Sequence, residues 1–169
     1  QQIDSRPSLN MKMSTTIKVY ILSALVLLTL PIHSPLHAAD AESKTSLERV
    51  VATEKGKLEN PLTITPEIIA EGKELYQTKT CGACHGGNGG GIHCPSLINE
   101  NWIYGGDDDT LFRLVALGSE GIAKAGYSRG DKEKHAGPMP AFGQAISDEQ
   151  DLWKIVSYIR SLQPGFATK

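Results

Sequence analysis

The feature that most constrains this chain is a five-residue motif, Cys81-Gly82-Ala83-Cys84-His85. The spacing C-x-x-C-H is typical of covalent attachment of a c-type haem, in which both thiols bond to the porphyrin edge and the histidine becomes the proximal iron ligand. A thioredoxin-like redox pair would need a βαβ context, and a zinc site would need a second pair of ligands. The sequence has neither pattern. The motif therefore predicts one haem c, held by Cys81, Cys84 and His85.

The first 38 residues are predicted to consist of upstream residues and a secretory signal peptide. An uncharged stretch over residues 19–32 follows Lys12 and Lys18 and precedes the small-residue end Ala38-Ala39. A positive region, a short apolar region and an alanine-rich cleavage site are typical of such a peptide, whereas a membrane span needs about 20 apolar residues. We therefore expect export to the periplasm and no membrane span after cleavage. An uncleaved N-terminal anchor is the alternative.

The remaining chain is weakly acidic. Residues 39–169 contain 14 lysines and arginines and 18 acidic residues, so their net charge is −4, against −2 for the full sequence. Nucleic-acid binding requires a basic face, and this class of function is excluded. About 130 residues are enough to bury one core.

The second axial ligand is predicted by elimination. Two of the three methionines precede residue 14, so Met139 is the only methionine of the predicted mature chain. Pro138 and Pro140 flank it, fix the backbone and exclude a helix. We therefore expect the Met139 thioether to bind the iron. His93 and His135 are the alternatives, and a bis-histidine iron would have a lower reduction potential.

Residues 64–163 are predicted to form one all-α domain around the haem. Residues 39–63 lack periodicity and are expected to be a mobile N-terminal extension, and residues 164–169 a C-terminal tail. Thr65-Pro66-Glu67 predicts a helix start, and that helix should run to about Gln77.

Two more helices are expected further along the chain. A short helix over Leu111–Leu117, capped by Asp109 or Thr110, should end at Gly118, and a long loop should follow over residues 119–138. A capping box over residues 147–150 predicts the start of the last helix. Its apolar stripe, with Tyr158 beside it, is expected to be buried; it consists of Leu152, Ile155, Val156, Ile159 and Leu162.

These features resemble the class I c-type cytochromes over about residues 64–163. The resemblance implies the class I cytochrome c fold, with three to four helices around one covalent haem, and an electron-transfer protein rather than an enzyme. Gly72 and Tyr76 are similar to the positions where the family's first helix crosses its last, with Tyr158 as partner. The Pro95 carbonyl should accept the proximal imidazole N–H, and Leu97 should press on the haem face.

A narrower resemblance lies in residues 102–112, the long loop and residues 137–143, which together are similar to the cytochrome c-L group. It implies a periplasmic quinoprotein methanol dehydrogenase, of the lanthanide-dependent kind, as electron donor, and a downstream cytochrome or terminal oxidase as acceptor. One alternative is a class I cytochrome c that serves another periplasmic dehydrogenase or oxidase. Another is a haem enzyme or gas sensor with an open distal position, although the sequence offers no obvious acid–base pair for catalysis.

Several residues near the haem motif allow two interpretations. Trp102 is expected in the core or in contact with a haem propionate through its N–H. Asp107, Asp108 and Asp109 predict either a solvated helix start or a calcium site near the propionates, because hard cations prefer clustered oxygen ligands. Cys94 is expected to be a small buried residue, and an unpaired exported thiol that dimerises or oxidises is the alternative.

Overall fold

The computed structural model describes residues 44–130 and 137–166. In these ranges the chain forms helices only, with no strand beyond an isolated bridge between Thr45 and Asp148. The helices are α2 (Ser46–Ala52), α3 (Pro66–Thr78), α4 (Cys81–His85), α5 (Asp108–Lys124) and α6 (Glu149–Ser161). The prediction of an all-α fold is confirmed. The predicted signal peptide and His135 lie outside the described residues, and none of the helices within them has the length and apolar character needed to cross a bilayer.

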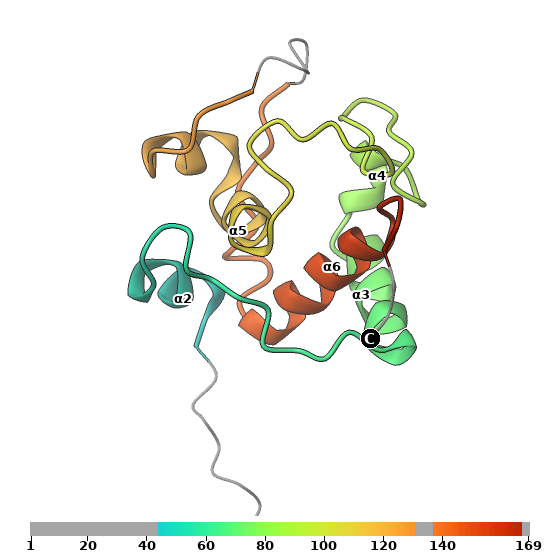
Figure 1. Cartoon of the computed structure of the whole chain (residues 1–169), viewed down its shortest axis with the longest axis horizontal. Coiled ribbons are helices and arrows are strands. Elements are labelled where there is room, and N and C mark those ends of the chain that lie inside the picture. The colour runs from blue at the N-terminus through green and yellow to red at the C-terminus, as the bar shows by residue number, and fades with distance from the viewer. Residues whose placement is uncertain (1–43, 131–136, 167–169) are drawn as a thin grey trace, which may run out of the picture. The chain divides into compact units, whose positions relative to one another are not determined.

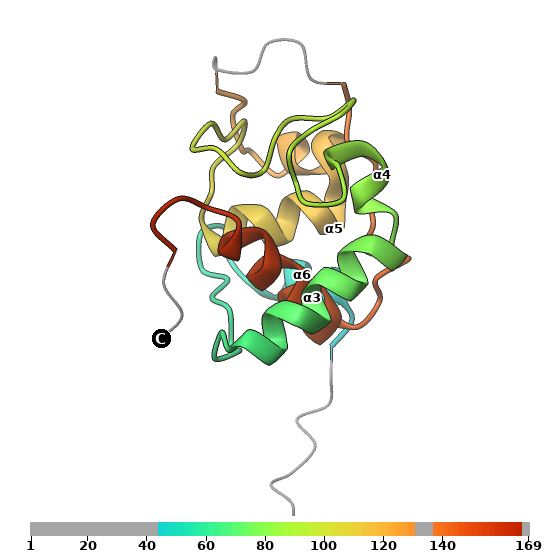
Figure 2. The same ribbon diagram turned by 90° about the vertical axis from the view of Figure 1, so that its right-hand side faces the viewer.

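Helices α3 and α6 cross at close range, as Figure 2 shows. The helix start predicted for α3 is present, since the Thr65 side chain accepts from the Ile68 amide. At the crossing, a Cβ added to Gly72 would lie 2.0 Å from the carbonyl oxygen of Lys154. The rings of Tyr76 and Tyr158 meet edge to face with centroids 5.2 Å apart. The small and aromatic residues predicted at this crossing therefore do meet there.

Helix α6 supplies more buried hydrophobic residues than any other helix of the described chain. Its predicted stripe is buried apart from Leu162, which is half-buried. The helix is capped by Asp148, which accepts from the Gln150 amide, so the capping box predicted from Ser147 is wrong. Trp153, which the predicted stripe omitted, is 1% exposed and packs against Phe112 of α5 with ring centroids 4.3 Å apart.

Helix α5 is longer than the predicted helix at both ends. Its N-cap is Asp107, which accepts from the Thr110 amide, rather than Asp109 or Thr110. Gly118 interrupts the helix with φ 68°, as expected for a residue that ends a helix, but residues 119–124 are helical again. The loop predicted over residues 119–138 therefore begins only after Lys124, where α5 ends. The backbone break at Gly118 turns the following residues toward the loop that carries Met139.

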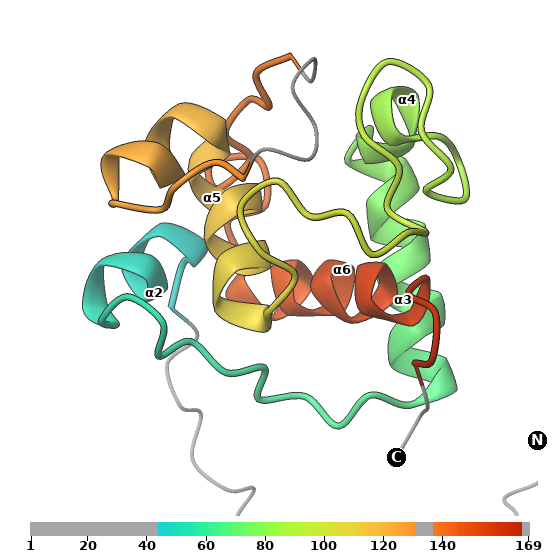
Figure 3. The same cartoon turned by 45° about the horizontal axis from the view of Figure 1, so that its top comes forward.

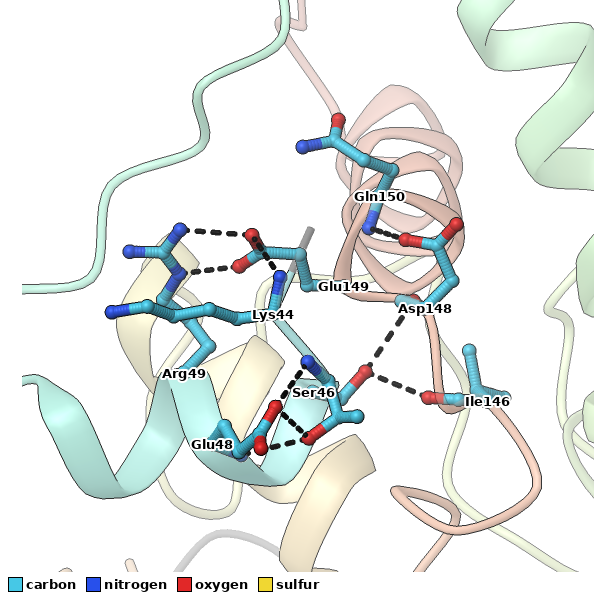
Figure 4. Close-up of polar contacts among 9 residues, drawn as sticks. Lys44, Ser46, Glu48, Arg49, Ile146, Asp148, Glu149 and Gln150 are labelled. Atoms are coloured by element: carbon cyan, nitrogen blue, oxygen red, sulfur yellow. Dashed lines mark hydrogen bonds and ion pairs between the residues drawn. The ribbon is translucent and has the colours of Figure 1, made fainter. Parts of the chain in front are cut away.

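The expected mobile extension is wrong for residues 44–58. Helix α2 lies beside α5 (Figures 1 and 3) and is capped by Thr45 and Glu48, which form a reciprocal capping box. The Ser46 hydroxyl donates to the Ile146 carbonyl at 2.7 Å. The Arg49 guanidinium pairs with Glu149, which is almost fully buried at the start of α6 (Figure 4). The first residues described are thus fixed to the last helix by contacts about 100 residues apart in sequence.

A buried arginine holds the segment after α2. Arg113 of α5 donates to the carbonyls of Val50, Thr53 and Glu54 at 2.7–3.1 Å. These carbonyls lie at the C-terminal end of α2, where the helix leaves its last acceptors without internal partners. Asp109 pairs with Arg113 and accepts from the Leu58 amide at 2.9 Å. Residues 44–58 are therefore part of the folded domain.

Candidate haem site

The proximal histidine is oriented by the loop that follows it. His85 is the last residue of α4, and its Nδ1 lies 2.8 Å from the carbonyl oxygen of Pro95. Because a carbonyl oxygen only accepts, Nδ1 is the protonated nitrogen and Nε2 keeps its lone pair for a metal. The expected contact with Pro95 is present. A hydrogen bond of this kind fixes the ring and raises the basicity of a ligating imidazole.

Tight turns bring Pro95 back to His85. Gly86 and Gly91 have φ of 83° and 84°, in the left-handed region that glycine adopts without strain. The Gly86 carbonyl accepts from the Tyr76 hydroxyl at 2.8 Å, which ties the loop to α3. Burial raises the pKa of Tyr76 well above its usual value, so this hydroxyl stays a donor. The loop geometry is therefore anchored to the α3–α6 crossing.

Met139 approaches the same space from the segment between α5 and α6. Its amide donates to the Ser119 hydroxyl at 2.9 Å, and its carbonyl accepts from the Ser119 amide at 2.9 Å. These contacts hold the Met139 main chain against the break in α5. The side chain is half-buried.

Two adjoining cavities share His85 and Met139 in their walls. Leu97 and Trp102 line both cavities as well, as does Leu114 of α5. The residues that line the two cavities come from α3, α4, the loop to α5, α5, α6 and the segment that carries Met139, and Figure 1 labels these helices. The cavity that α3 and α6 help to line is called the inner cavity, and the one lined by Cys94 and Pro95 the outer cavity. The inner cavity is almost entirely apolar. Its other lining residues are Tyr76, Cys81, Leu111, Val115, Ile155 and Ile159. His93, one of the two alternative axial ligands, is exposed and lines neither cavity. The geometry therefore does not support His93 as an iron ligand.

Cys94 was expected to be a small buried residue or an unpaired thiol, and the structure shows a different arrangement. Cys94 forms a disulfide with Cys84, with Cα atoms 5.2 Å apart, so it is not an unpaired thiol. Cys81 is free and buried, and burial raises the pKa of its thiol. A sulfur in a disulfide has no free valence for a thioether. In this state Cys81 alone is available for covalent attachment.

The rest of the site fits a haem. An apolar space with one imidazole and one thioether in its walls matches the donor set of His/Met cytochromes. The free thiol of Cys81 stands at the wall of the inner cavity, four residues before the imidazole. The residues present therefore suit a covalently held, six-coordinate haem once Cys84 is reduced.

Comparison with known proteins agrees with this geometry. The cytochrome c family matches residues 69–163, more than half of the chain. The chain belongs to the cytochrome c family. The membership supports a monohaem c-type cytochrome with covalent haem c and a role in electron transfer rather than catalysis by itself. The expected class I fold is confirmed.

Several proteins to which this cytochrome c is similar are named as oxidase subunits. The cbb3-type cytochrome c oxidase subunit FixP of Azorhizobium caulinodans is 33% identical over 134 residues, which cover 74% of this chain and 42% of that protein. The subunit CcoP of Azospirillum brasilense is 37% identical over 102 residues, which cover 56% and 28%. CcoP of Helicobacter pylori is 29% identical over 102 residues, which cover 60% and 30%. The chain thus spans less than half the length of these relatives.

The alternative of a calcium site at Asp107, Asp108 and Asp109 has no support in the structure of this cytochrome. Asp107 caps α5, Asp108 lies with Oδ1 3.4 Å from Arg160 Nε, and Asp109 pairs with Arg113. In the parts of the chain that the structure describes, no three histidine, cysteine or acidic side chains are grouped to hold a metal ion. Successive residues of a helix start point about 100° apart, so each carboxylate meets a different partner.

The sequence interpretation missed two polar groups that shape the domain. Ser119 carried no signal, because nothing in its neighbourhood indicates which carbonyl a serine will meet. The Asp109–Arg113 pair has the i,i+4 spacing of a helix ion pair, which predicts a surface pair and not a buried one. Tyr127 joins this pair by donating to Asp109; burial, and then that hydrogen bond, raise the pKa of Tyr127 to about 12.

Proposed function

We propose that this chain is a one-electron carrier whose haem iron has His85 and Met139 as axial ligands. Cys81 and Cys84 hold the haem by thioethers, Leu97 packs on its face, and the Trp102 N–H faces a propionate. The observation that carries the proposal is the position of His85 and Met139 in the walls of one apolar space. The bound haem supplies the one-electron couple of its iron.

The protein residues contribute orientation and exclusion of water. Pro95 fixes the His85 ring so that Nε2 is available. Ser119 fixes the main chain of Met139 and so would hold the thioether in place to bind the iron. The aliphatic residues of α5 and α6 keep the space apolar, which favours a soft thioether ligand. A pre-organised site of this kind suits fast electron transfer.

Spectroscopy tests the ligand set against an enzyme or sensor with an open distal position. The oxidised holoprotein should show the weak long-wavelength absorption of iron–thioether ligation, and the reduced protein should bind carbon monoxide only slowly. Rapid carbon monoxide binding by the wild-type protein would favour the open-site alternative. A bis-histidine spectrum would show that a histidine, and not Met139, is the second axial ligand.

We propose an electron acceptor and an electron donor, each from a different observation. The relatives are named as oxidase subunits, which favours electron delivery toward an oxidase. The likeness of residues 102–112 and 137–143 to the cytochrome c-L group favours a quinoprotein methanol dehydrogenase as donor. We place both reactions in the periplasm, as the predicted signal peptide implies.

Stopped-flow measurements test the proposed donor and the proposed acceptor separately. The oxidised cytochrome is mixed with reduced methanol dehydrogenase from the same genome, and the reduced cytochrome with a cbb3-type oxidase. Haem reduction by the dehydrogenase at a rate that increases with its concentration supports the donor. If only the oxidase reaction is observed, the donor is another dehydrogenase or cytochrome.

A further inference from the structure

The segment after α4 returns Cys94 to Cys84 by main-chain contacts. The amides of His93 and Cys94 each lie 3.2 Å from the Cys84 carbonyl, and the Gly91 amide donates to the His85 carbonyl at 2.7 Å. The resulting separation of 5.2 Å between the Cα atoms of Cys84 and Cys94 is within the range of native disulfides. The backbone turn therefore brings Cys84 and Cys94 within the distance that a disulfide requires.

Cys81 has a different environment. It is 8% exposed and has no disulfide partner, whereas Cys84 and Cys94 are each half-buried. Cys81 also faces the inner cavity, and Cys94 lines the outer one. The three cysteines are thus divided into one enclosed thiol and one accessible pair.

We propose that Cys94 protects Cys84: before haem attachment the two form a disulfide, and a dithiol reductant must open it before Cys84 can be alkylated by haem. The proposal rests on the proposed attachment of haem through Cys84. It assigns a thiol–disulfide exchange site to the turn 84–94, with a dithiol as its reactant.

The exchange is balanced without any further reactant. A thiolate of the dithiol attacks one sulfur of the disulfide and forms a mixed disulfide, and the other cysteine leaves as a thiolate. The second thiol of the reagent then displaces the remaining cysteine. Cys84 and Cys94 gain two electrons and two protons, and the dithiol becomes a disulfide. Addition of the Cys84 S–H across a vinyl group afterwards transfers no net electrons.

Peptide mapping of the full-length chain, produced without haem attachment, tests the pairing directly. We expect a cross-linked peptide that joins Cys84 to Cys94, and alkylation by iodoacetamide of Cys81 only after denaturation. The matched variants are Cys81→Ser, which should still form the disulfide, and Cys84→Ser, which should not pair Cys81 with Cys94. A Cys81–Cys84 link, or three alkylated thiols in the air-oxidised protein, would overturn the proposal.

Haem attachment tests the protecting role. Haem is reduced with dithionite and freed of the excess under argon. Air-oxidised apoprotein is then incubated anaerobically with this ferrous haem, with or without dithiothreitol, and the thioethers are located by mass spectrometry of the haem peptides. The wild type should carry a thioether at Cys84 only with dithiothreitol. Cys94→Ala should carry it under both conditions. If Cys94→Ala is blocked to the same extent as the wild type, Cys94 has no protecting role.

The two proposals fail in different ways. A disulfide mapped to Cys84 and Cys94 in the fully matured holoprotein would contradict attachment at Cys84, and with it the protecting role. A holoprotein with two thioethers but an open distal position would contradict the electron-carrier ligand set and leave the Cys94 result intact.

Discussion

Ser119 and Met139 are joined by reciprocal hydrogen bonds across the break in α5. The Ser119 amide donates to the Met139 carbonyl at 2.9 Å, and the Met139 amide donates to the Ser119 hydroxyl at 2.9 Å. At the break, a Cβ on Gly118 would lie 2.7 Å from that same carbonyl. The position of the proposed thioether ligand thus depends on a glycine and a serine about twenty residues upstream.

Ser119→Ala should weaken thioether ligation without detaching the haem. Loss of one such hydrogen bond costs about 0.5–1.5 kcal/mol, so carbon monoxide should bind the reduced protein about two- to tenfold faster. Ser119→Thr keeps the hydroxyl and should restore slow binding, and Ser128→Ala at an exposed position is the control. Equal carbon monoxide kinetics in all four proteins would show that Ser119 does not position Met139.

Met139→Ala should retain covalent haem but lower the reduction potential and open the iron to small ligands, because a soft thioether stabilises ferrous iron. Met139→Leu keeps most of the apolar volume and removes the sulfur, so it separates ligation from packing. Both variants should lose the thioether absorption in a visible spectrum and show a lower midpoint in a redox titration. A wild-type spectrum in either variant would contradict ligation by Met139.

Gly72→Val should destabilise the α3–α6 crossing. Its Cβ would overlap the Lys154 carbonyl at 2.0 Å, which forces the helices apart. Overpacking costs about 1–3 kcal/mol, and backbone overlap belongs at the upper end of that range. Ala70→Val introduces the same side chain at an exposed position of α3 and is the matched control. Thermal unfolding followed by circular dichroism should separate the two variants, and a wild-type melting temperature in Gly72→Val would contradict the crossing.

Acid should remove the contribution of the Asp109 carboxylate to the free energy of unfolding. Burial alone would raise the pKa of this carboxyl, but hydrogen bonds from Tyr127, the Leu58 amide and Arg113 outweigh burial and hold the pKa below its usual value. The stability that depends on the carboxylate is therefore complete above the ordinary carboxyl pKa of about 4 and is lost as the pH falls below it.

Tyr127→Phe checks this dependence, because it removes one donor to Asp109. A hydrogen bond to a charged group contributes about 1.5–3 kcal/mol, so the variant should be less stable by this amount at pH 6. The difference should shrink as the pH approaches 3, in guanidinium unfolding curves. Tyr104→Phe removes a hydroxyl that donates to Ser119 instead, and its effect should not change over this range. A constant difference for Tyr127→Phe would contradict the proposed linkage.

The sequence alone determined the features that depend on neighbouring residues. The motif over residues 81–85 predicts its chemistry because the two cysteines and the histidine act from one short turn. Thr65 predicts the start of α3 because a cap accepts from an amide three residues on. The stripe of α6 was predictable because helical periodicity places its residues on one face of that helix. The crossing at Gly72 was expected from the resemblance to class I cytochromes.

Only the tertiary structure decided the contacts between distant segments. Helix α2 has seven residues, too few for a periodic signal, and it is held by Arg49 and Ser46 through partners about 100 residues away. The pairing of Cys94 with Cys84 depends on the path of the turns between them, which cysteine spacing does not specify. Local patterns report which groups a segment can offer, whereas folding decides which distant group each of them meets.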